Sequence, residues 1–115
     1  MNAATLGLTI ATVFAIGAGQ ILFKLAALPA SQEGASWHAL ANGWLFAALV
    51  VYALATALWV WVLRTVPLNV AYPFMGFAFV VVPLLAWLFL GEPLDARVLA
   101  GAVLVGAGVV VASWR

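Results

Sequence analysis

Long apolar stretches alternate with short polar segments along the chain. A helix that crosses the hydrocarbon core of a bilayer needs about 20 mostly apolar residues, and four stretches reach that length. They cover residues 3–28, 40–63, 69–90 and 97–114. Because these stretches take up most of the chain, we predict an all-α membrane protein with one domain, residues 1–115, and four transmembrane helices.

The polar segments carry residues that begin and end helices. Asn42 and Asp95 precede the second and fourth spans, where an N-cap side chain accepts hydrogen bonds from free backbone amides. Gly91 and Pro93 follow the third span and stop it. Within the third span, Pro83 lacks the N–H that an α-helix needs, so a kink is expected there. Such kinks form cavities in transporters, but they also occur in membrane helices without a transport role.

The composition removes several classes of protein. Hydrophobic residues make up 69% of the chain and charged residues 6%, against roughly 45–50% and about 25% in soluble domains, so a soluble protein is excluded. The four basic residues are scattered and form no patch for nucleic acid. With no cysteine and one histidine, the chain offers neither a disulfide nor a thiolate or histidine metal cluster. No nucleophile lies beside an evident base, so we expect no enzyme, no metal and no cofactor.

Tryptophans and basic residues mark the predicted membrane surfaces. Tryptophan favours the interface, and the six tryptophans fall near predicted helix ends: Trp37, Trp44, Trp59, Trp61, Trp87 and Trp114. Four spans put the N-terminus, Arg64 and Arg115 on one side and Lys24 and Arg97 on the other. Because each side carries two basic residues, the positive-inside rule gives almost no preference for either orientation. The α-amino group weakly favours cytoplasmic termini.

Gln20 and Lys24 are the strongly polar side chains that lie well inside a predicted span. Four residues apart, they share one face of the first helix with Gly17. An ionisable residue inside a span is a functional candidate. Lys24 also lies roughly 28 Å beyond Thr5, at about 1.5 Å per residue, close to the far surface. Two interpretations therefore stay open: a snorkelling or ion-paired lysine, and a lysine that binds an anionic head group.

Two further polar side chains are candidates for contact with a substrate. Glu92 follows the third span on the same side as Lys24, where it pairs with that lysine, is displaced by a substrate phosphate, or is a solvated loop residue. Tyr72 lies near Asn69 at the start of the third span, where its hydroxyl would enter a cavity formed by a bent helix. With Gln20 and Lys24, these residues make up the predicted substrate site.

The fourth span carries small residues at helical spacing. Ala102 and Gly106 form one pair four residues apart, and Gly108 and Ala112 form another. Such pairs let a second helix approach closely. The stripe predicts a packing surface for a helix of the same chain or of a second chain.

Three segments, in this order and spacing, resemble the four-helix branch of the drug/metabolite transporter superfamily. They are AGQILFKLA at residues 18–26, VPLNVAYPF at residues 66–74, and LGEPLDARVLAGAVLVGAGVVV at residues 90–111. The resemblance covers nearly the whole chain. It implies a helical dimer, with the substrate handled between like or unlike subunits.

Two subfamilies of that branch differ at one position of the first helix. The small multidrug resistance exporters carry a glutamate there, eight residues before a lysine that matches Lys24, and this glutamate binds cation or proton in turn. This chain has Ile16 at that position, which leaves no titratable group. Gln20, Lys24 and the AYP motif at residues 71–73 look instead like the EamA-like subunits of flippases for aminoarabinose linked to undecaprenyl phosphate.

The sequence therefore favours a small transporter of the bacterial inner membrane that moves a polyprenyl-phosphate-linked sugar or a similar anionic lipid between leaflets. Lys24 would contact the phosphate, and Gln20 and Tyr72 the polar head group. The alternatives are an exporter of small cations or hydrophobic drugs, which Ile16 disfavours, and a membrane subunit that scaffolds a partner without transport.

Overall fold

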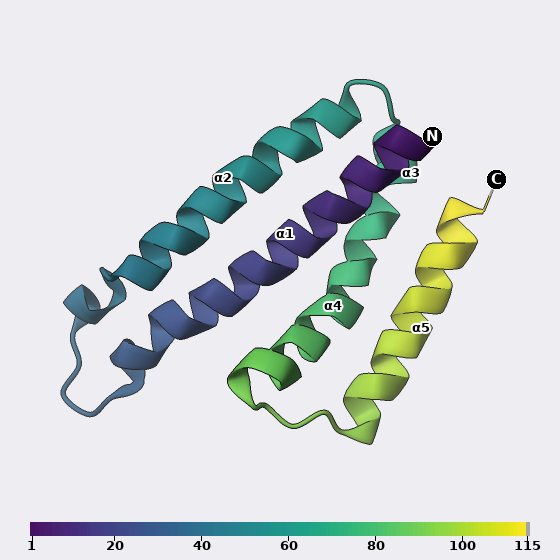
Figure 1. The fold of residues 1–115 in the computed structure, drawn as a ribbon. Coiled ribbons are helices and arrows are strands. Elements are labelled where there is room, and N and C mark those ends of the chain that lie inside the picture. The colour runs from purple at the N-terminus through teal and green to yellow at the C-terminus, as the bar shows by residue number, and fades with distance from the viewer. Residues whose placement is uncertain (115) are drawn as a thin grey trace.

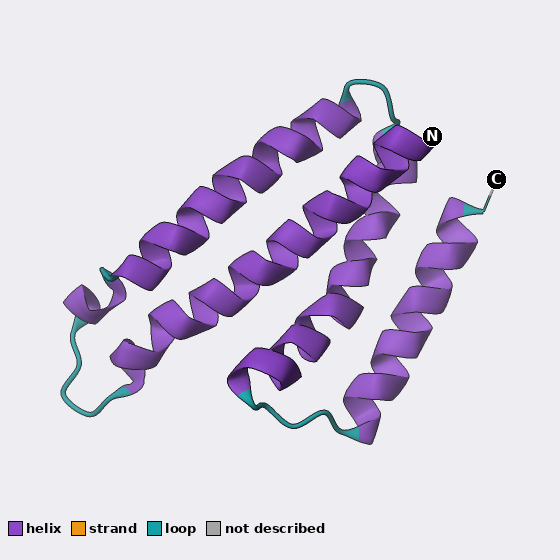
Figure 2. Ribbon diagram, viewed as in Figure 1, coloured by secondary structure: helices purple, strands orange, loops and turns teal. Residues whose placement is uncertain are grey.

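The computed structural model describes residues 1–114, which form helices joined by short loops (Figures 1 and 2). The regular long helices are α1 (Ala3–Ala27), α2 (Gly43–Leu63) and α5 (Ala96–Ser113), and the third span covers Leu68–Leu90. All four segments are long and apolar enough to cross a membrane, which confirms the predicted fold class. Arg115, which the sequence assigns to the side of the termini, lies outside the described residues.

The third span is not one regular helix. Its pieces are α3 (Leu68–Ala71), the 3₁₀ segment η3 (Tyr72–Phe77), α4 (Ala78–Leu85) and the wide π-type segment η4 (Ala86–Leu90). Pro73 lies near the start of η3 and Pro83 lies inside α4. Because neither proline has an N–H to donate, the α-helical hydrogen-bond pattern is interrupted in this span. Helix α4 continues through Pro83, and the irregular segments lie before Ala78 and after Leu85, so the kink expected at Pro83 stays a prediction.

The predicted capping residues occupy the ends of the helices. Asn42 Oδ1 accepts a hydrogen bond from the backbone amide of Leu45 at 3.1 Å, at the start of α2. Asp95 Oδ1 accepts one from the amide of Val98 at 2.9 Å, at the start of α5. Gly91 ends the third span with a φ of 68°, a left-handed conformation that glycine adopts without steric cost. These contacts explain why the spans begin and end where they do.

Two short 3₁₀ segments fill the connection between α1 and α2. They are η1 (Leu28–Ser31) and η2 (Trp37–Leu40). Because η2 is a separate turn and Asn42 caps the next helix, α2 begins at Gly43, three residues after the start expected from hydropathy. The connection between the first two spans is therefore partly helical.

The helices lie side by side in an open layer in the order α2, α1, α4, α5 (Figure 1). Helix α1 packs against both α2 and α4, and α5 packs against η3 and α4. The Cα atoms extend over 53 × 34 × 19 Å. In the most apolar 18-residue stretch of each span, 28% of the first is buried but only 6% of the fourth. Most of the surface of α5 is therefore available to lipid or to another chain.

Small residues allow close packing at each seam of the layer. A Cβ atom at Gly17 would lie 2.9 Å from Val81 Cγ1, on the seam between α1 and α4. A Cβ atom at Gly76 would lie 2.7 Å from Val109 Cγ2, between η3 and α5. By contrast, nothing lies within 4 Å of a Cβ atom placed at Gly106 or Gly108. The small-residue stripe predicted in the fourth span is therefore largely unused at its glycines within residues 1–114.

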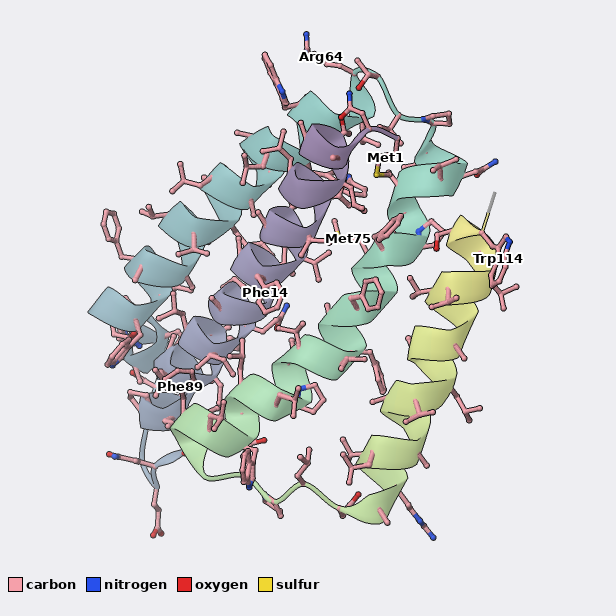
Figure 3. The ribbon with its side chains drawn as sticks, turned by 45° about the vertical axis from the view of Figure 1, so that its right-hand side comes forward. Met1, Phe14, Arg64, Met75, Phe89 and Trp114 are labelled. Carbon is pink, nitrogen blue, oxygen red and sulfur yellow. The ribbon has the colours of Figure 1, made fainter. Side chains whose placement is uncertain are left out.

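The two ends of the layer carry different connections. The N-terminus and Arg64 lie at one end, whereas Phe89, which is close to the loop between the third and fourth spans, lies towards the other (Figure 3). The connection between α1 and α2 is at the same end as that loop (Figure 1). Charged residues of the loops are thus divided between two surfaces, as an up-and-down arrangement of four spans requires.

Candidate functional site

Gln20 of α1 and Tyr52 of α2 are joined by a hydrogen bond between neighbouring spans. The Gln20 Nε2 group donates to the Tyr52 hydroxyl. The tyrosine ring lies over Gly19, where a Cβ atom would clash with Tyr52 Cε2. The Phe23 ring packs beside it, with ring centroids 5.0 Å apart and planes inclined by 48°. The absence of a side chain at Gly19 thus lets Tyr52 reach the amide of Gln20.

The depth of this pair follows from the length of α2. Tyr52 is nine residues after Gly43 and eleven before Leu63, so it lies near the middle of the span. At about 1.5 Å per residue, this is roughly 14 to 17 Å from either end of the helix. Unsatisfied polar groups are costly at such a depth, because the hydrocarbon core supplies no hydrogen-bond partner. The bond between Gln20 and Tyr52 reduces that cost for both side chains.

A groove of about 330 Å³ lies between α1 and the third span, beside Gln20. It is lined by Ile16, Gln20, Ala78, Phe79, Val82 and Pro83. Gln20 supplies the polar side chain, and the other five side chains are apolar. Because Pro83 has no N–H, the Phe79 carbonyl has no α-helical donor four residues later. The groove is therefore almost wholly apolar, with Gln20 as the polar side chain in its lining.

Lys24 lies one helical turn beyond Gln20 on the same face of α1. Its side chain is exposed, and none of the hydrogen bonds between side chains in residues 1–114 involves its ammonium group. The level of Lys24 follows from Asn42, whose Nδ2 donates to the carbonyl of Ala26 at 2.9 Å. Ala26 is two residues past Lys24, so Lys24 lies close to the level at which α2 begins. Residue 24 thus lies near the end of the span at which α2 begins, about 6 Å along the helix axis from Gln20.

The other two residues of the predicted site lie apart from Gln20. Tyr72 is 63% exposed in η3, near the start of the third span and towards the end opposite Lys24. Glu92 is exposed in the loop before α5, at the same end as Lys24. The structure thus brings Gln20 and Lys24 together on one helix face and assigns the neighbouring hydroxyl to Tyr52 rather than to Tyr72.

Tyr52 is a site residue that the sequence reasoning missed. It is separated from Gln20 by 32 positions, and hydropathy alone gives no register for two antiparallel helices. One signal was present in the sequence: Tyr52 is the tyrosine that falls in the middle of an apolar span, where a hydroxyl needs a partner.

No acidic side chain lines the groove. The three acidic residues, Glu33, Glu92 and Asp95, all lie in loops or at a helix cap. Ile16 lines the groove four residues before Gln20. Among the described residues, no group of three His, Cys, Asp or Glu side chains could hold a metal ion. The lining of this groove therefore contains no charged side chain.

Comparison with known proteins identifies the same family as the three sequence motifs. The chain matches the EamA-like transporter family over residues 2–114. A protein of Yersinia pestis (strain Pestoides F), named as the probable 4-amino-4-deoxy-L-arabinose-phosphoundecaprenol flippase subunit ArnE, is 38% identical over 97 residues, which cover 84% of this chain and 85% of that protein. A protein of the same name in Salmonella paratyphi B (strain ATCC BAA-1250 / SPB7) is 34% identical over 104 residues, which cover 90% and 91%.

No solved structure matches the chain at a significant level. The family match extends over nearly all of the chain, and both relatives are similar to it over most of their own length. These findings confirm the resemblance inferred from the three motifs. The chain therefore belongs to the EamA-like transporter family.

Proposed function

We propose that the chain is one subunit of a flippase that moves a polyprenyl-phosphate-linked sugar, or a similar anionic lipid, across the bacterial inner membrane. The observation that carries the proposal is the position of Lys24. Its side chain is exposed one helical turn beyond Gln20, and Gln20 lines a groove that contains no acid. The names of the relatives, flippase subunits for an aminoarabinose linked to undecaprenyl phosphate, support the same substrate class.

Each part of such a substrate has a suitable environment in this chain. A phosphate at the membrane surface would accept charge-assisted hydrogen bonds from the Lys24 ammonium. The polar head group would move along the face of α1, where Gln20 interrupts the apolar lining of the groove. The polyprenyl tail would stay in the bilayer, since the outer surfaces of the spans are apolar. The chain thereby lowers the cost of moving a polar group through hydrocarbon.

The open layer supports an assembly of two chains. A four-helix layer leaves the face with Gln20 uncovered, and water or lipid would have to complete the path in a lone subunit. Gly106 and Gly108 of α5 are uncovered within residues 1–114, which leaves room for a second helix to pack closely. The relatives are named as subunits. We therefore propose that a second chain, like or unlike this one, closes the path.

Transport of a cation is the main competing function, and a direct comparison separates the two. The chain, with any subunit that copurifies, is reconstituted in vesicles of phosphatidylethanolamine and phosphatidylglycerol. One sample receives a polyprenyl phosphosugar, and another receives a quaternary ammonium dye. We expect head-group translocation of the phosphosugar above that of protein-free vesicles and no accumulation of the dye. Accumulation of the dye without movement of the phosphosugar would overturn the proposal.

A further inference from the structure

Arg64 and Trp61 are stacked at the end of α2 that lies beside the N-terminus. The Arg64 Cζ atom is 3.6 Å from the centre of the Trp61 ring. The ring covers one flat face of the guanidinium and attracts its positive charge. The N–H donors of a guanidinium lie in its plane, so the stack leaves them accessible. No hydrogen bond within residues 1–114 uses these donors. The stack thus presents an oriented cation to its surroundings.

The stack is directed away from the other helices. Val62 and Val66 are buried on either side of Arg64 and anchor the turn that ends α2. Trp61 is 54% exposed, and its spacing of three residues from Arg64 places both side chains on one face of the helix. Because α2 lies at one edge of the layer (Figure 1), this exposed face is in contact with the surrounding bilayer.

An exposed apolar strip continues from the stack towards the middle of the membrane. Ala57 and Leu54 precede Trp61 by four and seven residues, and both are exposed. The ten residues from Arg64 to Leu54 span about 15 Å along the helix axis. Since the hydrocarbon core is about 30 Å thick, the strip has the length of one leaflet. A cation at the surface above such a strip matches the form of a single phospholipid.

The charges at this end of the layer favour an anionic head group. The acidic side chains Glu33, Glu92 and Asp95 lie in the two loops at the opposite end (Figure 1). Met1, with its α-amino group, lies at the same end as Arg64 (Figure 3). A guanidinium binds a phosphate through two parallel hydrogen bonds. The ammonium of a zwitterionic lipid would meet two cations here and no acidic side chain.

We infer that Arg64 and Trp61 form a binding site for the phosphate of an anionic membrane phospholipid, such as phosphatidylglycerol, in the leaflet beside the N-terminus. The site lies at the membrane surface opposite to Lys24, and it does not depend on the proposed function. The lipid belongs to the bilayer around the protein and is not its cargo. Held at Arg64, it fixes the depth of the end of α2 in that leaflet.

Native mass spectrometry of the full chain, with any copurifying subunit, measures the lipids that the protein retains in detergent. Phosphatidylglycerol and phosphatidylcholine with the same acyl chains are offered in equal amounts. We expect about fivefold more phosphatidylglycerol than phosphatidylcholine on wild type, the effect of one cation near a membrane surface. Arg64→Gln should remove most of this preference. Arg64→Lys should retain part of it, because the charge remains but the planar fork is lost.

Arg97→Gln is the matched control for charge. Arg97 is an exposed cation at the start of α5, at the opposite end of the layer. This variant has the same net charge as Arg64→Gln. It should keep the wild-type preference for phosphatidylglycerol. Loss of the preference in both variants to the same extent would show a general effect of net charge and would overturn the site.

Trp61→Leu separates a built site from attraction by charge alone. The variant keeps the net charge and removes the ring that orients the guanidinium, so the preference should fall at least twofold. Trp44→Leu is its control, because Trp44 is 49% exposed near the other end of the same helix. It should bind phosphatidylglycerol as wild type does. An unchanged preference in Trp61→Leu would overturn the role of the stack.

Two further results would assign the guanidinium to a different partner. If Arg64→Gln keeps the lipid preference but no longer retains a copurifying subunit, Arg64 pairs with an acid of that subunit and the inference is wrong. If equimolar polyprenyl phosphate displaces phosphatidylglycerol from wild type and not from Arg64→Gln, the site binds cargo and the inference is also wrong. Neither result changes the role proposed for Lys24.

Discussion

Asn42 Nδ2 donates a hydrogen bond to the carbonyl oxygen of Ala26 at 2.9 Å, and this contact ties the end of α1 to the start of α2. The same side chain caps α2 through Leu45 and also donates to the Ala39 carbonyl at 3.0 Å. One amide thus fixes the level of Lys24 relative to the second span.

Replacement of Asn42 should lower the stability of the protein, and two variants separate the contribution of its capping oxygen from that of its amide donor. Asn42→Ala removes the cap and both donated bonds, and we expect a loss of about 2 kcal/mol in the free energy of unfolding in detergent micelles. Asn42→Asp keeps the capping oxygen and removes the donor to Ala26, so about half of that loss is expected. Asn69→Ala is a control, because Asn69 is exposed and caps no helix. Equal stability of wild type and Asn42→Ala would contradict the structural role of this residue.

Replacement by alanine should affect stability differently for a glycine between packed helices and for a glycine with no neighbouring atoms. A Cβ atom at Gly19 would clash with the Tyr52 ring, so Gly19→Ala should displace the ring and cost about 1–3 kcal/mol through overpacking. Nothing lies within 4 Å of a Cβ atom at Gly7 of the same helix. Gly7→Ala should therefore stabilise α1 by up to about 1 kcal/mol. Thermal unfolding of the two variants in one detergent checks the sign of each effect, and destabilisation of similar size in both would refute the packing described here.

Pro83→Ala should restore a backbone donor to the Phe79 carbonyl. We expect a more regular third span, a rise of about 1 kcal/mol in the free energy of unfolding, and slower translocation, because Pro83 lines the groove beside Gln20. Pro93→Ala, in the loop before α5, is the control and should change neither quantity. Faster translocation by Pro83→Ala would contradict a role for the interrupted helix.

An acid at position 16 should reverse the preference of the groove for charge. Ile16→Glu adds a carboxylate to the wall that contains Gln20, and repulsion of a phosphate should reduce translocation of an anionic lipid about tenfold. Ile10→Glu places the same charge in a different groove of α1, lined by Val13, Phe14, Phe77, Val80 and Val81. That variant carries a similar cost of insertion into the membrane but should transport faster than Ile16→Glu. Equal rates in the two variants would show that repulsion in the groove plays no part.

The architecture was largely predictable because it depends on local properties of the sequence. Span length follows from runs of apolar residues, and the caps formed by Asn42, Gly91 and Asp95 involve residues only three to five positions away. The hydrogen bond from Gln20 to Tyr52 is different, since it joins residues 32 positions apart. Apolar antiparallel helices do not reveal their register in the sequence, because almost any rotation presents a similar surface to lipid.

The candidate site was therefore predictable only along one helix. The spacing of Gln20 and Lys24 gave their shared face, whereas the grouping with Tyr72 required knowledge of where the third span begins. Tyr72 directly follows α3, which lies near the same end of the layer as the N-terminus (Figure 1). The small-residue stripe of the fourth span posed a similar problem, because its spacing predicts a contact without naming the partner helix.

The most direct test of the account is the initial rate of head-group translocation at low substrate, measured for variants of Lys24 in vesicles. If the ammonium holds the phosphate, Lys24→Ala should reduce the rate at least tenfold, and Lys24→Arg should restore most of it. Arg97→Ala removes a cation at the same membrane surface and should leave the rate unchanged. Translocation by Lys24→Ala at the wild-type rate would contradict the role assigned to this lysine and with it the proposed mechanism.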